Sequence, residues 1–138
     1  MVPSDINFNS KDLKILNSFS NNIKKIRTLM DNQQLNEYVK FIIDKSFDAN
    51  KYFNDEAPWN KKDDKNRLNT IIYVSLEVIR KISILLLPVI PYSANKALTS
   101  LNLNTKTFKL NSITDHLILK SGTKINNQGI LFKKIEKK

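Results

Sequence analysis

The chain has 138 residues, which is enough for one domain with a buried core. It contains no cysteine and one histidine, which excludes disulfide bonds, thiolate catalysis and multi-histidine metal sites. The net charge of +10 is uneven: residues 1–59 carry eight basic and eight acidic residues, whereas residues 60–138 carry fifteen and five. Such an excess of basic residues favours a polyanionic partner, most commonly a nucleic acid. A genome biased toward lysine and asparagine codons would also raise the net positive charge.

Neither an export signal nor a membrane span is expected. The first five residues lack the basic start and apolar core of a secretory signal. The longest apolar stretch, residues 71–90, carries Glu77, Arg80 and Lys81, and charged groups in hydrocarbon cost several kcal/mol. We therefore expect this stretch to be a helix buried in protein and the chain to be cytoplasmic, which the lack of cysteine suits.

Glycine is almost absent, with two residues at positions 122 and 129. Because hairpins require such residues, residues 1–103 are expected to be helical. Apolar residues recur at helical spacing in four segments. These are a first helix that is capped by Asn9 or Ser10 and ends near Met30, a second at about 34–55, a third at about 65–87 and a fourth at about 92–101.

The predicted fold class is all-α, an antiparallel helical bundle formed by residues 1–103. The third helix is apolar around most of its circumference and should lie at the centre. The second helix should bury a stripe that includes Leu35, Tyr38, Ile42 and Phe53. Residues 104–138 are interpreted as an irregular basic arm with a helical turn at 112–116, which packs back on the bundle or on another domain.

Pro58 and Trp59 are the most informative pair. Proline cannot continue a helix and disfavours helical angles just before it, so the second helix must stop here and aim the only tryptophan. An indole near Lys61, Lys62 and Lys65 can stack on an unpaired base while the ammonium groups meet phosphates. Two other interpretations stay open: Trp59 fills the core, and the lysines are ordinary solvated surface.

Reactive groups are sparse. Asp115 stands beside His116, but neighbours in sequence rarely converge on a substrate, and no serine occupies a nucleophile-elbow pattern. Carboxylate pairs occur beside lysines and are interpreted as solvated charge. These pairs are Asp44 with Asp48, Asp55 with Glu56, and Asp63 with Asp64. We predict no catalytic residue, metal ligand or cofactor in this chain.

Three segments carry a family resemblance. Asn-Lys-Tyr-Phe-Asn-Asp-Glu-Ala-Pro-Trp at 50–59, with Leu-Leu-Leu-Pro-Val-Ile-Pro at 85–91, resembles the C-terminal anticodon-binding helical domain of bacterial methionyl-tRNA synthetase. Ser-Gly-Thr-Lys-Ile-Asn-Asn-Gln-Gly-Ile-Leu-Phe-Lys-Lys-Ile-Glu at 121–136 resembles the closing segment of its short form. Helices that end in Leu-Pro-x-x-Pro also occur in related synthetases, so the equivalent domain of another synthetase, lacking Ala-Pro-Trp, is an alternative.

The resemblance implies that Trp59 stacks on an anticodon base and that Pro58 fixes its angle. Asn50 and Tyr52 become candidates for positioning Trp59, although such side chains also commonly satisfy backbone groups at helix ends. The implied partners are the anticodon stem-loop of tRNA(Met) and the catalytic domain of the same enzyme. The implied activity is ATP-dependent ligation of methionine to its tRNA by the intact enzyme.

The family's first bundle helix, which carries an asparagine and an arginine that read the anticodon, has no counterpart in this sequence. Its catalytic domain has none either, so the chain alone is expected to be inactive. A function of a different class is an independent helical interaction module in which Trp59 anchors the core or a protein partner. A base-stacking Trp59 should be partly exposed beside lysines, whereas a core anchor should be buried.

Overall fold

The computed structural model describes residues 2–3, 5–103, 110–114, 118–120, 122 and 124–125. Within these residues the structure is all-α, as predicted, and forms no strand. The helices are α1 (Ser10–Ser20), α2 (Ile23–Asp31), α3 (Leu35–Glu56), α4 (Lys65–Leu86) and α5 (Pro91–Ser100), with 3-10 turns η1 (Pro58–Asn60) and η3 (Leu110–Thr114). Asp115, His116 and the closing segment at 126–138 lie outside the described residues.

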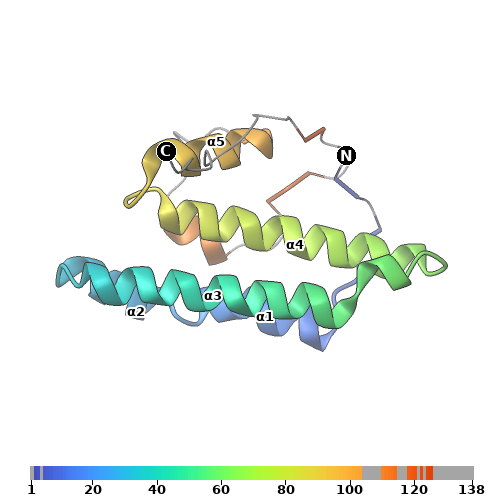
Figure 1. Cartoon of the computed structure of the whole chain (residues 1–138), viewed down its shortest axis with the longest axis horizontal. Helices are drawn as coiled ribbons and strands as arrows, with labels where there is room; N and C mark the ends of the chain where they lie inside the picture. Colours follow the sequence, from blue (N-terminus) through green and yellow to red (C-terminus); the bar gives the residue numbers. More distant parts are fainter. Residues whose placement is uncertain are drawn as a thin grey trace, which may run out of the picture.

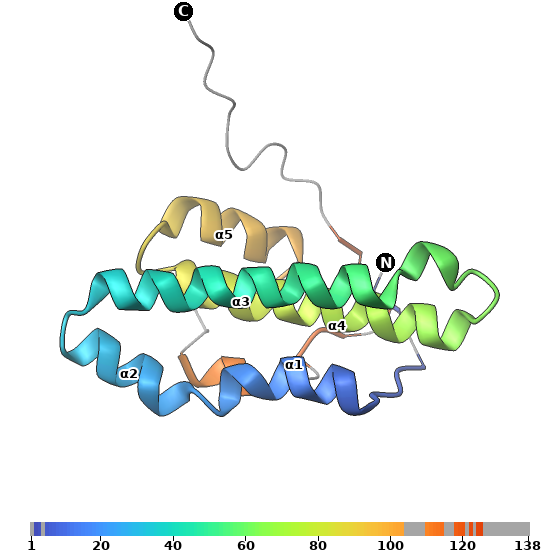
Figure 2. The same cartoon turned by 60° about the horizontal axis from the view of Figure 1, so that its bottom comes forward.

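The helices run antiparallel along one long axis (Figure 1). α3 and α4 form a long hairpin joined through η1, and α5 returns along the opposite side of α4. Figure 2 shows η3 beside α1 and α2, which it contacts. None of the described helices combines the length and apolar character needed to cross a membrane.

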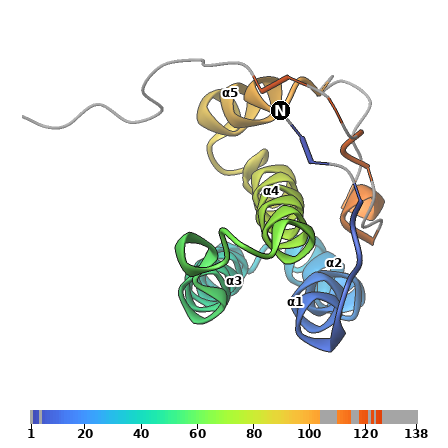
Figure 3. The ribbon, with the colours of Figure 1, turned by 90° about the vertical axis from the view of Figure 1, so that its right-hand side faces the viewer.

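α4 is the central helix, as its sequence predicted. It contacts α1, α3, α5 and η3, and the end-on view in Figure 3 places it between α5 on one side and α1 and α3 on the other. Its buried apolar side chains meet those of α1, α2 and α3 in one main core, because a helix covered on several sides needs apolar groups around most of its circumference. Members of this core include Leu16, Phe19, Ile26, Tyr38, Ile42, Ile71, Val74, Val78 and Leu85.

The predicted first helix is in fact two helices, and the prediction of one continuous helix to Met30 was wrong. Asn21 and Asn22 separate α1 from α2. The Asn22 side-chain amide donates to the Ser18 carbonyl at 2.6 Å, and its backbone N–H donates to the Phe19 carbonyl at 3.2 Å. Asparagine competes for backbone groups in this way, which interrupts a helix despite a continuous apolar pattern.

The buried face of α3 also differs from the predicted stripe. Tyr38 and Ile42 are buried as predicted, but Leu35 is 59% exposed and Phe53 is 39% exposed. Phe41 and Tyr52 are buried instead. Because α2 and α4 both pack on α3, its inner face is wider than a single stripe and turned away from the predicted one.

α5 begins one residue earlier than predicted, with Pro91 in its first turn, where the missing proline N–H has no intrahelical partner to lose. Ala94, Leu98 and Leu101 are buried as predicted. Leu101 joins a smaller core that also includes Val2, from the start of the chain. Its buried members are Val2, Tyr73, Leu101 and Leu119.

Candidate nucleic-acid interface at the end of α3

A tight turn at the end of α3 carries Trp59. Ala57 caps α3 in the left-handed region at φ 44° and ψ 65°, which costs a residue with a Cβ about 1 kcal/mol. Pro58 then opens η1, and the Asn60 and Lys61 N–H groups donate to the Ala57 and Pro58 carbonyls at 2.9 and 3.1 Å. Pro58 is buried whereas Trp59 is 52% exposed, so the turn directs the indole outward.

Among the residues that the structure describes, Trp59 has one aromatic neighbour. The Phe53 ring lies edge-on to the indole, with ring centroids 6.0 Å apart and planes at 61°. Aromatic pairs of this kind contribute about 0.5–1.5 kcal/mol beyond their buried area, which is enough to favour one orientation of the indole. Half of the Trp59 surface therefore stays available to a ligand.

Charged residues follow Trp59 along the loop into α4. Lys62 and Lys65 are exposed, and Lys61 is partly buried. The two aspartates of this loop are also exposed, but Asp64 is engaged as the helix cap, because its Oδ1 accepts the Arg67 N–H at 3.1 Å. Asp64 is thus the cap of α4. One short segment presents both the indole of Trp59 and the lysine ammonium groups.

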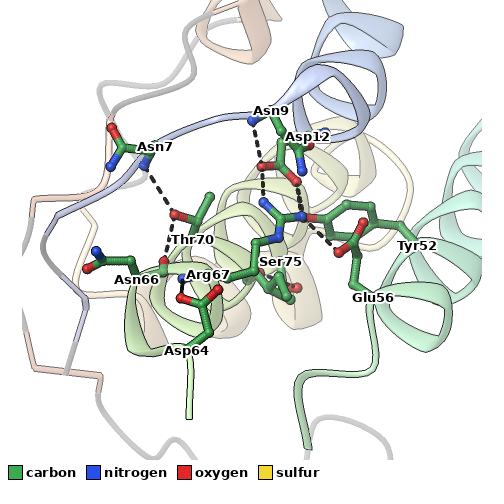
Figure 4. A network of polar contacts seen from close by, with 11 residues as sticks. Asn7, Asn9, Asp12, Tyr52, Glu56, Asp64, Asn66, Arg67, Thr70 and Ser75 are labelled. Carbon is green, nitrogen blue, oxygen red and sulfur yellow. Dashed lines mark hydrogen bonds and ion pairs between the residues drawn. The ribbon is translucent and has the colours of Figure 1, made fainter. Parts of the chain in front are cut away.

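A buried ionic network lies behind this turn (Figure 4). The Arg67 guanidinium contacts both carboxylate oxygens of Asp12 at 2.7 and 2.9 Å, and its Nη2 contacts Glu56 Oε2 at 2.9 Å. The Tyr52 hydroxyl and the Asn9 N–H donate to the same Asp12 carboxylate at 2.5 and 3.0 Å. The network joins the start of α1, the end of α3 and the start of α4.

The charges in this network stabilise one another. Burial acts to raise the pKa of Asp12, but hydrogen bonds from Arg67, Tyr52 and Asn9, with the Arg67 charge, outweigh it and leave that pKa below its usual value. The hydrogen bond to Asp12 raises the pKa of Arg67, against the effect of burial. Burial and the bond to Asp12 raise the pKa of Tyr52 above its usual value. At neutral pH Asp12 is therefore ionised, Arg67 is protonated and the Tyr52 hydroxyl is neutral.

The structure brings only some of the predicted residues together. Trp59 and Pro58 share η1, and the three lysines follow it. Tyr52 is buried, and its hydroxyl donates to Asp12 Oδ1 at 2.5 Å. Asn50 is exposed and lines an apolar groove of about 260 Å³ between α3 and α4, next to Phe53.

The interpretation of Glu56 as solvated charge was wrong, since it is 8% exposed and paired with Arg67. Asp12 and Arg67 were not singled out from the sequence at all. One signal could have found Arg67: the chain has twenty lysines and only three arginines. Arginine is retained where a planar fork must meet carboxylates, a task for which lysine is a poor substitute.

A second polar cluster is buried farther along α4. Glu77, Arg80 and Lys81 are fully buried, and all three bond backbone groups of residues 112–119. These are the charges that the sequence offered only as evidence against a membrane span. They hold η3 and Leu119 against the bundle.

Comparisons with known proteins agree with the fold and with the family resemblance. The family model described as the anticodon binding domain of methionyl tRNA ligase matches residues 2–138. A methionine–tRNA ligase of Rickettsia conorii is 37% identical over 126 residues, which are 91% of this chain and 25% of that protein. A methionine–tRNA ligase of Thermotoga maritima is 35% identical over 116 residues, covering 80% of this chain and 18% of that protein.

Solved structures show the same likeness. The apo form of Mycobacterium tuberculosis methionyl-tRNA synthetase superposes with a TM-score of 0.87 at 27% identity, covering 99% of this chain and 28% of that one. The same enzyme in complex with methionyl-adenylate gives a TM-score of 0.86 at 28% identity, covering 96% of this chain and 27% of that one. The chain thus spans about a quarter of the length of the Rickettsia relative and of these structures. It belongs to the family of anticodon-binding domains of methionyl-tRNA ligase.

Proposed function

We propose that this chain recognises the anticodon loop of tRNA(Met), with Trp59 stacking on an exposed anticodon base and Pro58 fixing the angle of the indole. The observation that carries the proposal is a half-exposed tryptophan on a short, hydrogen-bonded turn at the end of α3. Stacking of a base on an aromatic ring contributes about 1–3 kcal/mol. An exposure of 52% does not support the alternative in which Trp59 anchors the core.

Lys61, Lys62 and Lys65 contact the phosphate backbone of the loop in this proposal. Their place in the segment that follows Trp59 supports this role. Three phosphate contacts would give log K a slope of about −2 against log salt concentration for a single-stranded ligand. In this proposal Tyr52 supports Trp59 indirectly, through its hydrogen bond to Asp12. Asn50 supports Trp59 from the groove that it lines next to Phe53.

The domain serves methionine–tRNA ligation together with a catalytic domain that uses ATP and methionine, in the cytoplasm. The names of the relatives support this role, and so does the methionyl-adenylate complex of the Mycobacterium tuberculosis enzyme. We further infer that residues 1–103 form the recognition bundle and that residues 104–138 form an arm that packs on it. The contacts of η3 with α1 and α4 support the second point.

The experiment is binding of an anticodon stem-loop carrying CAU, and of one with a changed first base, to the wild type and to Trp59→Ala. Tyr92→Ala is the matched control, because Tyr92 is also an exposed aromatic residue but lies on α5, across α4 from α3. We expect Trp59→Ala to weaken CAU binding about tenfold or more and the control to leave it unchanged. Salt-sensitive binding that ignores both the base and Trp59 would overturn the proposal.

A further inference from the structure

We propose that Arg67 is a positioning residue for Trp59, because it holds the end of α3 and the start of α4 together and thereby fixes the turn between them. The inference rests on the proposed function, in which Trp59 is the residue that meets RNA. It concerns the side of the turn that faces the protein, where no nucleotide is expected.

Arg67 fixes both ends of the loop that contains Trp59. Its Nη2 lies 2.9 Å from Oε2 of Glu56, the last residue of α3 and the one that directly precedes the turn. Its backbone N–H donates at 3.1 Å to Asp64, the residue that caps α4. The Arg67 side chain therefore holds the start of the loop of residues 57–64, and the Arg67 backbone holds its end.

Asp12 keeps the guanidinium in place. Both Asp12 oxygens accept from the Arg67 fork, and Asp12 is fully buried and further bonded by Tyr52 and Asn9. A planar fork that bonds two carboxylates has little freedom to rotate. Arg67 is itself only 17% exposed, so the contact with Glu56 is shielded from solvent and salt.

The turn needs this support because of its own geometry. The left-handed Ala57 is intrinsically disfavoured, and the Phe53 ring contacts Trp59 only edge-on. Without the tie to Glu56, the turn would populate other conformations in which the indole is not aimed outward. The apparent affinity for RNA then falls in proportion to the fraction of molecules whose turn still aims the indole outward.

The test uses Glu56→Gln, which keeps the shape of the side chain but removes its charge, and Arg67→Lys, which keeps the charge but removes the fork. Thr70→Val is the control, because it breaks a bond at the same end of α4: Thr70 Oγ1 accepts the Asn7 N–H at 3.1 Å. Two quantities are measured below the unfolding transition of every variant. One is the fluorescence anisotropy of Trp59 without RNA, and the other is affinity for the CAU stem-loop.

We expect lower anisotropy and about fivefold weaker CAU binding in both network variants, as when one molecule in five holds the competent turn. The Thr70→Val control should match the wild type in both readouts even though its free energy of unfolding falls. Since Trp59 is the only tryptophan, the anisotropy reports on the turn alone.

Failure of this inference and failure of the proposed function are distinguishable. If Trp59→Ala abolishes CAU binding while Glu56→Gln and Arg67→Lys match the wild type in both readouts, Arg67 is not a positioning residue and the proposed function stands. If Trp59→Ala changes nothing, the proposed function fails, and the anisotropy still decides whether Arg67 orders the turn. Should Glu56→Gln not fold, Glu56→Asp gives the same two readouts.

Discussion

α4 carries two arginines that sit in opposite kinds of environment. Arg67, near the start of the helix, is partly exposed and bonds carboxylates that come from α1 and α3. Arg80, two-thirds of the way along, is fully buried, and its nearest carboxylate, Glu77 at 2.8 Å, lies on the same helix. Arg80 then donates to the Ser112 carbonyl at 2.9 Å. The first arginine joins three helices, and the second holds η3 against α4.

The difference shows what burial does to an ion pair. A fully buried pair is taken out of water at high cost and is stable only while every charge has its partner. The Arg67 pairs are desolvated less completely, since the Arg67 side chain keeps 17% of its exposure, so breaking them is expected to cost less. We therefore expect changes near Arg80 to lower the free energy of unfolding most, and changes near Arg67 to lower it less and also to alter the presentation of Trp59.

The largest effect is expected for Glu77→Gln. It leaves the Arg80 guanidinium buried without its carboxylate, and breaking a buried pair in this way costs about 3–5 kcal/mol. The free energy of unfolding from urea titration checks it. Asp48→Asn is the control, since it breaks the exposed Lys45 pair of the same i,i+3 spacing and should change stability by less than about 0.5 kcal/mol. Equal losses of stability in the two variants would mean that burial does not determine how much each ion pair contributes.

An intermediate effect is expected for Asp12→Asn, about 1.5–3 kcal/mol at neutral pH, because charged hydrogen bonds to Arg67 are lost. The folded-state pKa of Asp12 lies below its usual value. The contribution of ionised Asp12 to the free energy of unfolding is therefore complete above about pH 4. It is lost as the pH falls through the pKa that Asp12 has in the folded state. The stability difference between wild type and variant should shrink in acid. A difference that stays constant down to about pH 2 would contradict the lowered pKa.

The smallest effect is expected for Tyr73→Phe. The Tyr73 hydroxyl donates to the Leu119 carbonyl at 2.6 Å, and the ring is buried beside Phe8. The variant keeps the packing and loses one hydrogen bond, which costs about 1 kcal/mol. Burial, with the nearby Glu77 charge, raises the pKa of Tyr73 to about 12, so ionisation should destabilise the wild type as the pH rises from 10 toward that value. Amide hydrogen exchange at Leu119 should rise in the variant. Unchanged exchange would show that Glu77, which accepts the Leu119 N–H at 2.9 Å, holds the segment alone.

Much of the fold could be predicted because the local signals and the tertiary packing agree. α4 and α5 were found within one residue at each end, and the proline that stops α3 was also found. The break at Asn21 was missed because the apolar pattern continues through it, and only the bond from Asn22 to Ser18 shows that the backbone leaves the helix.

The sequence by itself determined an all-α bundle, a central α4 and an aromatic residue at the end of α3, since periodicity, proline and the lack of glycine are local properties. The tertiary structure decided which charges are buried. Asp12 and Arg67 are 55 residues apart, and Glu77 bonds a backbone group 42 residues away. Whether a carboxylate is solvated or paired depends on what packs against it, and no local pattern of residues encodes that contact.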